Sequence, residues 1–151
     1  MAADPITKAL VDALKANATL LANLAKYPEG GDPAVFAADS PGVSAVPRDA
    51  RFPWCVVARV SDDEGVTGSK TRSGRDLLRD IAVYTDAETD TGSLVDELGE
   101  AVRALFHRST SLAVPGFATL LEHVVSGPVV APTDERVRGR IVTVRVVLTP
   151  P

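Results

Sequence analysis

The chain has few of the residues that small enzymes and metal proteins use for chemistry. One cysteine (Cys55) and two histidines (His107 and His123) occur among its 151 residues. A disulfide framework needs paired cysteines, and a zinc site needs several cysteine or histidine ligands at fixed spacing. Phosphate-binding glycine motifs and the G-x-S-x-G nucleophile motif are also missing. The sequence therefore predicts a protein that is not an enzyme, with no catalytic residue, no cofactor and no metal.

One pair of residues has the chemistry for nucleophilic catalysis. Cys55 could act as the nucleophile and His107 as its base. Cys55, however, lies within the β-branched and apolar segment 54–60 (WCVVARV), which predicts a buried strand. A buried thiol is normally inert, and His107 suits the end of a helix. We interpret Cys55 as a small core residue.

Long apolar runs and a basic surplus are missing too. Charged residues interrupt the apolar N-terminal segment, so it resembles neither a signal peptide nor a membrane span. We expect a protein made in a cytoplasm, with no membrane partner. The formal net charge of −4 argues against non-specific nucleic-acid binding as the main task.

The residues that are present predict one α+β domain over 1–151. Hydrophobic residues make up 45% of the chain, and a chain of this length can bury a core without a metal ion or a disulfide to stabilise it. Pro5 after Asp4 predicts a helix start, and Asn17 predicts a break before a short second helical piece. We expect about four mainly antiparallel strands with two helices packed on one face, in the order α-β-β-α-β-β. The expected helices cover 5–26 (with the break) and 94–107, capped by Thr91 or Ser93, and the expected strands cover 54–60, 76–84, 117–125 or 117–130, and 136–148.

Two segments are expected to be loops. Segment 27–53 carries five of the eleven prolines and is predicted to be a Pro/Gly-rich arm, in which Val35 and Phe36 could form a short edge strand. Segment 61–75 is polar and is predicted to be a long hairpin loop. Long loops in a compact domain are often functional, so both are candidate contact regions.

The strand at 76–84 and the last strand have apolar residues on both faces. Helices on one side of a sheet cover only one of these faces, so the other needs a partner, which a second subunit would provide. On the strand at 76–84 one face carries Leu77, Arg79, Ile81 and Val83, and the other carries Leu78, Asp80, Ala82 and Tyr84.

Two charged clusters are candidate contact sites. Asp62, Asp63 and Glu64 lack the alternating spacing of a calcium loop and are read as a solvated hairpin. Arg136, Arg138 and Arg140 alternate and therefore project from one strand face. They could contact phosphates or face solvent, but in a net acidic chain with few aromatic residues we favour ion pairs, including pairs between subunits.

The order of segments resembles the tail terminator (tail-completion) proteins of long-tailed bacteriophages and prophages. The resemblance covers nearly the whole chain as a pattern of segments, with a longer Pro/Gly region at 28–52 than is usual in that family. The segments that carry it are ALVDALKANATLLANLA (9–25), PWCVVARV (53–60), SGRDLLRDIAVYTD (73–86), LVDELGEAVRALFH (94–107) and RVRGRIVTVRVVL (136–148).

The resemblance implies a structural virion protein at the head-proximal end of the tail. Such subunits form a ring, typically a hexamer, that caps the tail tube, stops its polymerisation and offers a surface to the head–neck connector. The implied partners are other copies of the chain, the tail tube protein and the connector protein, with DNA only as cargo passing through the lumen. The candidate subunit or tube contacts are Asp62, Asp63, Glu64, Lys70, Arg72, Arg75, Arg79, Arg136, Arg138 and Arg140.

Other functions remain open at this point. A head–tail connector (neck) protein of the same virion has a similar size and ring habit and is the nearest alternative. An enzyme and a cellular adaptor are more distant alternatives.

Overall fold

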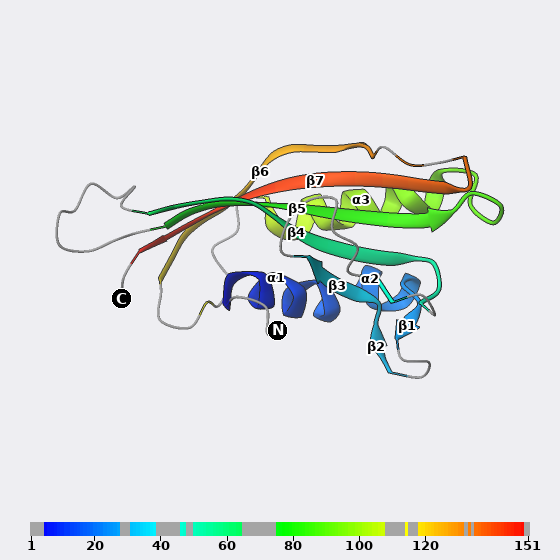
Figure 1. Cartoon of the computed structure of the whole chain (residues 1–151), viewed down its shortest axis with the longest axis horizontal. Helices are drawn as coiled ribbons and strands as arrows, with labels where there is room; N and C mark the ends of the chain where they lie inside the picture. Colours follow the sequence, from blue (N-terminus) through cyan, green and yellow to red (C-terminus); the bar gives the residue numbers. More distant parts are fainter. Residues whose placement is uncertain are drawn as a thin grey trace.

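The computed structural model gives the arrangement of most of the chain (Figure 1). The described residues are 5–27, 31–38, 46–47, 50–64, 75–107, 114, 118–131, 133 and 135–149, without the side chains of 5, 61–64, 75, 118–122 and 149. All structural statements below concern these residues.

A five-stranded sheet in the order β3-β4-β5-β7-β6 forms the body of the fold. The short edge strand β3 is parallel to β4, and every other neighbouring pair is antiparallel. A separate two-stranded ribbon joins β1 to β2. The strands are β1 (Lys26–Tyr27), β2 (Asp32–Pro33), β3 (Val35–Ala38), β4 (Trp54–Glu64), β5 (Arg75–Asp86), β6 (Ala118–Val130) and β7 (Val137–Thr149).

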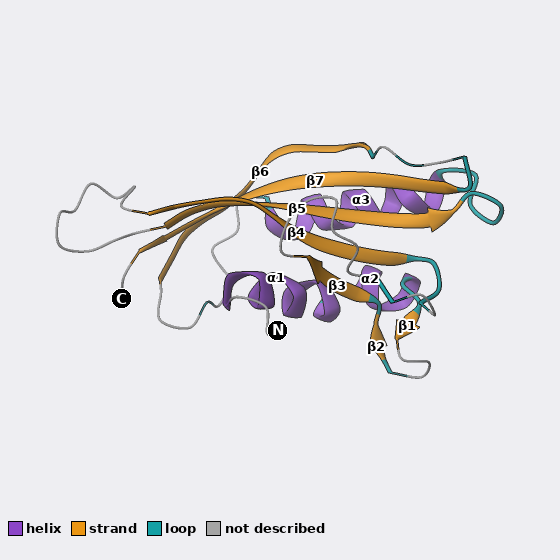
Figure 2. Ribbon diagram, in the orientation of Figure 1, coloured by secondary structure: helices purple, strands orange, loops and turns teal. Residues whose placement is uncertain are grey.

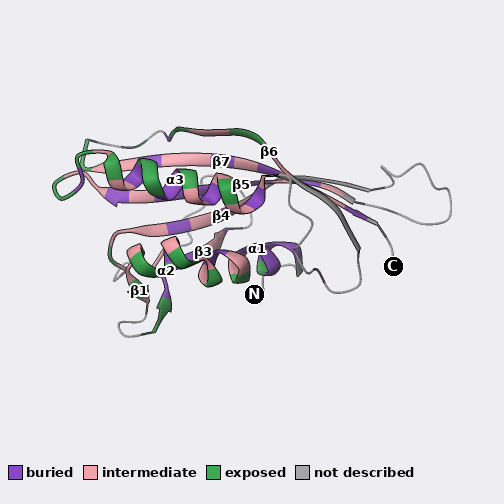
Figure 3. Cartoon of the chain, turned by 180° about the vertical axis from the view of Figure 1, so that it is seen from behind, coloured by how far each residue is buried: buried purple, intermediate pink, exposed green. Residues whose placement is uncertain are grey.

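Three helices complete the layers, and all of them pack on the same face of the sheet (Figure 2). They are α1 (Pro5–Ala16), α2 (Ala18–Asn23) and α3 (Ser93–Phe106). Seen from behind, α3 lies over β5 and β7 (Figure 3). Its residues Val95, Leu98, Val102 and Phe106 are buried. None of these helices is long and apolar enough to cross a membrane.

The core lies between this helical layer and the sheet. Alternate residues of the central strands point into it, because successive side chains of a strand lie on opposite faces. Leu10 and Leu14 of α1 and Leu98 of α3 are fully buried there, and each such side chain contributes about 1.5–3 kcal/mol of burial free energy. The strand residues of the core include Cys55, Val57, Leu77, Ile81, Val83, Val142, Val144, Val146 and Leu148.

Local interactions explain where the helices begin. The Asn17 carboxamide oxygen accepts hydrogen bonds from the backbone N–H groups of Thr19 and Leu20, both at 3.1 Å, so Asn17 ends α1 and caps α2 as expected. Position Asp4, the expected cap of α1, lies outside the described residues.

The beginning of α3 differs from expectation. Neither Thr91 nor Ser93 caps this helix; Gly92 occupies the cap position with φ +117° and has no side chain to offer. The carboxylate of Asp90 caps the helix instead, because it accepts hydrogen bonds from the N–H groups of Gly92, Leu94 and Val95 at 2.9–3.1 Å. An acceptor two residues before the cap therefore satisfies the free donors of the first turn.

The α+β class, the long strands and the placement of the helices on one face agree with the prediction, but two details need correction. The main sheet has five strands and not about four, because the short edge strand considered at Val35 and Phe36 does form, as β3, and pairs with the start of β4. The hairpin strands also run further than expected: β4 extends to Glu64 and β5 begins at Arg75, where these two residues pair.

Candidate protein-interaction surface

The face of the sheet turned away from the helices is the candidate site, and we call it the open face. No described helix covers it. Because opposed residues of paired strands share a face, the registers of β4, β5 and β7 fix its membership. Its apolar residues are Trp54, Val56, Ala58, Leu78, Ala82, Tyr84, Ile141 and Val147.

Two pairs of polar residues on the open face are joined by hydrogen bonds within the chain. Thr143 Oγ1 donates to Asp80 Oδ1 at 2.6 Å, directly across the β5–β7 ladder. Arg145 Nε donates to Asp76 Oδ1 at 2.8 Å, and a second nitrogen of the same guanidinium reaches the other carboxylate oxygen. Such bidentate pairs are the stronger kind of ion pair, and this one raises the pKa of Arg145 through its hydrogen bonds and charge. The side chains of Asp76, Asp80, Thr143 and Arg145 therefore already have hydrogen-bond partners within the chain.

An exposed valine on the edge strand β6 extends the apolar surface. Val129 is 48% exposed and pairs with Ile141 of the open face, whereas Val130 pairs with Arg140 and therefore lies on the opposite face. A single exposed apolar residue is common on protein surfaces, but Val129 adjoins the apolar residues of an uncovered sheet face, and a continuous apolar surface of this kind is typical of a protein contact.

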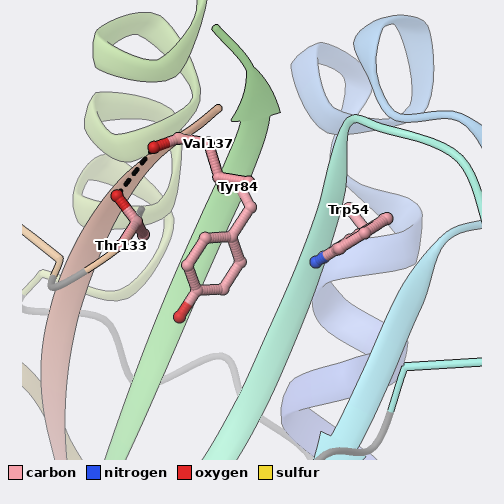
Figure 4. A pocket seen from close by; sticks show the side chains of 4 residues that line it. All are labelled: Trp54, Tyr84, Thr133 and Val137. Carbon is pink, nitrogen blue, oxygen red and sulfur yellow. Dashed lines mark hydrogen bonds between the residues drawn. The ribbon is translucent and has the colours of Figure 1, made fainter. Parts of the chain in front are cut away.

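A hollow lies at the end of the open face where β7 begins. Its volume is about 240 Å³, and Trp54, Tyr84, Thr133 and Val137 line it. Figure 4 shows the two aromatic side chains on neighbouring strands, with Thr133 and Val137 beside Tyr84. The Thr133 hydroxyl donates a 2.7 Å hydrogen bond to the carbonyl oxygen of Val137. Phe52 stacks on Trp54 with ring centroids 3.9 Å apart. Three of the seven aromatic side chains therefore gather at this end of the sheet.

Gly139 fixes one wall of the hollow. A Cβ atom at this position would lie 2.9 Å from Cδ1 and Cε1 of Tyr84 and from Cβ of Ala131. Only the absence of a side chain lets the Tyr84 ring lie so close to β7. Burial raises the pKa of the Tyr84 hydroxyl, and the negative charge of Asp80 adds to the shift. The hydroxyl is therefore neutral near pH 7 and remains a hydrogen-bond donor.

The predicted contact residues separate into two groups at opposite ends of the sheet. Asp62, Asp63 and Glu64 of β4 pair with Leu77, Asp76 and Arg75 of β5, so the acidic residues and Arg75 gather at the end where β7 finishes. Lys70 and Arg72 lie outside the described residues.

The arginines of the last strand lie toward the other end, about 20–40 Å away at the usual rise per residue. Arg140 Nε is 2.8 Å from Asp96 Oδ1, and Arg138 Nε donates to the carbonyl oxygen of Asp90 at 2.8 Å. Both side chains thus join β7 to the start of α3 inside the subunit. Arg136 is exposed where β7 begins.

Arg79, also expected at a contact, is fully buried on the helix side of β5. Its Nε donates to Thr7 Oγ1 at 3.2 Å, and another of its nitrogens donates to the carbonyl oxygen of Leu78 at 3.0 Å. The Arg79 side chain therefore links β5 to α1 in the interior of the protein. The alternation of residues along the strand already placed Arg79 on the same face as Leu77 and Ile81.

The residues considered for catalysis lie in the core or at helix and strand ends. Cys55 is fully buried, and burial raises the pKa of its thiol to about 12, as expected for an inert core residue. His107 ends α3, and its ring centroid lies 5.2 Å from that of His123 on β6. Within the described residues, no group of three or more histidine, cysteine or acidic side chains could hold a metal ion.

Comparison with known proteins shows a shared fold. No protein-family model and no curated protein matches the chain. Among solved structures, a chain described as "Virion of native gene transfer agent (GTA) particle" is similar, with a TM-score of 0.66 and 19% sequence identity. The match covers 95% of this chain and 94% of that chain, so the two folds correspond over almost their whole lengths.

Proposed function

We propose that the chain is a structural subunit of a phage-like virion, which forms a ring on the finished tail tube. The ring would stop tube polymerisation and present a surface for head or neck attachment. The observation that carries the proposal is the near end-to-end match with a chain of a gene transfer agent particle. The segment pattern of tail terminators points in the same direction.

The open face supports an assembly role over a catalytic one. It offers apolar side chains from β4, β5 and β7, and its charged side chains Asp76, Asp80 and Arg145 already have hydrogen-bond partners within the chain. A surface of this kind can be buried against a partner without leaving unsatisfied charges, which would cost free energy. The described residues also include no metal-binding cluster, and the only cysteine is buried.

Assembly on tail tubes tests the proposal directly. Native mass spectrometry and light scattering would measure the mass of the protein alone and mixed with tail tubes. We expect closed rings, typically of six copies, bound at tube ends. A protein that remains monomeric and never binds tube ends would contradict the proposal.

A neck protein of the same virion is the second candidate, because the matched chain is described only as part of a gene transfer agent virion, a description that fits either role. Electron microscopy of lysates that lack this gene separates the two functions. Abnormally long tails without heads indicate tail termination. Normal tails that fail to join heads indicate a neck role.

A further inference from the structure

We propose that the aromatic hollow at the end of the open face binds an arginine side chain of a partner protein in the virion. The inference rests on the proposed function and deepens it, because it names the chemistry of one contact that the subunit makes. Its basis is the pair of aromatic walls and the sign of the charge beside them.

The walls of the hollow suit a flat cation. The indole of Trp54 and the phenol ring of Tyr84 stand on directly opposed residues of β4 and β5, so they share the open face (Figure 4). The faces of aromatic rings attract a cation, and a guanidinium also stacks on them because it is planar. At about 240 Å³ the hollow is smaller than the roughly 300–1,000 Å³ of a site for a drug-sized ligand, so it fits a single side chain.

Asp86 supplies a negative charge beside the hollow. It lies two residues after Tyr84 on β5 and is directly opposed by Val137, which lines the hollow, so its side chain shares the open face. Its Oδ1 accepts a 2.9 Å hydrogen bond from the backbone N–H of Glu88, and its Oδ2 has no hydrogen-bond partner among the described residues. It therefore differs from the other acidic residues of the open face, whose carboxylates are bonded to side chains of β7.

The surrounding charges favour a cation as well. Burial raises the pKa of the tyrosine hydroxyl in the hollow, and the charge of Asp80, on the same face, raises it further. Arg138 and Arg140 do not offset these carboxylates, because they alternate with the open-face residues of β7 and turn toward α3. Arg51 and Arg136, next in sequence to residues at the hollow, are exposed to solvent, where the high dielectric constant weakens the effect of their charge.

Arginine fits this site better than lysine. The N–H groups of a guanidinium can donate two parallel hydrogen bonds to one carboxylate, while its plane lies against an aromatic ring. A lysine ammonium is a more strongly hydrated point charge and cannot stack. The expected contact therefore places the guanidinium of the partner between the aromatic walls, with the Asp86 carboxylate at its end and the apolar open face around it.

Titration with a small arginine probe tests the hollow by itself. Trp54 is the only tryptophan, so its fluorescence reports binding directly. N-acetyl-arginine amide should change this fluorescence in a saturable way and bind at least about fivefold more tightly than N-acetyl-citrulline amide, which has nearly the same shape without the charge. Equal binding of the two probes would assign the hollow to apolar contacts and overturn the inference.

Two variants that each remove one negative charge locate the site. Asp86→Asn keeps the Oδ1 acceptor for the N–H of Glu88, and Glu97→Gln changes an exposed position on α3. We expect Asp86→Asn to weaken binding of the arginine probe by about three- to tenfold and to leave the citrulline probe unchanged, whereas Glu97→Gln should affect neither probe. Unchanged affinity of Asp86→Asn for the arginine probe would overturn the inference.

The outcomes separate this contact from the ring itself. Rings on tube ends together with equal affinity for the two probes would refute the contact and leave the proposed function intact. Charge-dependent binding of the arginine probe by a protein that never binds tube ends would support the contact and contradict the function.

Discussion

Thr85 Oγ1 donates a 2.6 Å hydrogen bond to Asp90 Oδ2, and both side chains are buried. The same carboxylate accepts from the first N–H groups of α3. One acidic side chain therefore connects the end of β5 with the start of the helix that covers it. The carbonyl oxygen of Asp90 also accepts from Arg138, which adds β7 to the junction.

Replacing Asp90 with alanine should lower the free energy of unfolding by about 2–4 kcal/mol, because a helix cap and a buried hydrogen-bond network are lost together. Urea denaturation followed by circular dichroism measures the change. Glu97→Ala, an exposed change on the same helix, serves as the control and should stay within about 0.5 kcal/mol of the wild type. Equal stability of the two variants would contradict the role given to Asp90.

The same residue makes stability depend on pH. Burial alone would raise the pKa of Asp90, but hydrogen bonds from Thr85 and three backbone N–H groups outweigh it and hold the pKa below its ordinary value. A carboxyl whose pKa is lowered by folding stabilises the protein above the unfolded pKa of about 4, and this contribution is lost as pH falls below that value.

We therefore expect the wild type to lose more stability than Asp90→Asn when the pH falls from about 6 to about 3. Denaturation curves at both pH values give the comparison. Because the two proteins share all other carboxyl groups, the difference between their pH dependences isolates Asp90. Parallel curves would argue against a lowered pKa.

Two glycines with positive φ differ in the space around them. Gly127 has φ +99°, and a Cβ there would lie 2.3 Å from the carbonyl oxygen of Ile141; Gly92 has φ +117° and nothing within 4 Å. Gly92→Ala should cost about 1–2 kcal/mol from backbone strain alone. Gly127→Ala adds a clash with backbone and should cost at least about 3 kcal/mol, measured by thermal or urea denaturation. A similar loss at both positions would contradict the close approach of β6 to β7.

Cys55 should be inert toward thiol reagents in the folded protein. A thiol pKa raised from 9.0 to about 12 lowers the thiolate fraction near pH 8 by roughly 1,000-fold, and burial blocks access as well. Ellman's reagent should react rapidly with Cys55 in urea and hardly at all in buffer. Rapid reaction of the native protein would reopen the catalytic interpretation of Cys55 and His107.

Periodicity was enough to predict the long elements of the fold. The helical stripe of α1, the capping role of Asn17 and the alternation of β7 depend on local sequence, so they could be read directly. The ends of β4 and β5 could not be predicted from local sequence, because the polar residues 61–64 form a strand only through their pairing with β5. Likewise β3 exists because Val35–Ala38 pairs with residues about twenty positions later.

The candidate site was harder to predict because it depends on register. The sequence places apolar residues on both faces of β5, which correctly indicated an uncovered face. It does not indicate that Trp54 opposes Tyr84, or that Gly139 lies beside the Tyr84 ring. The sequence-based contact list gave weight to charge, and the structure buries Arg79 while it turns Arg138 and Arg140 toward α3.

The outer strand β6 carries register shifts at three places along its pairing with β7. A regular outer strand would present an unbroken row of N–H and C=O groups to any other extended chain. Interrupted as it is, β6 offers only short pieces of such a row, which another strand cannot follow for long. A protein with such an outer strand resists edge-to-edge pairing into fibres, so it should remain dispersed at high concentration.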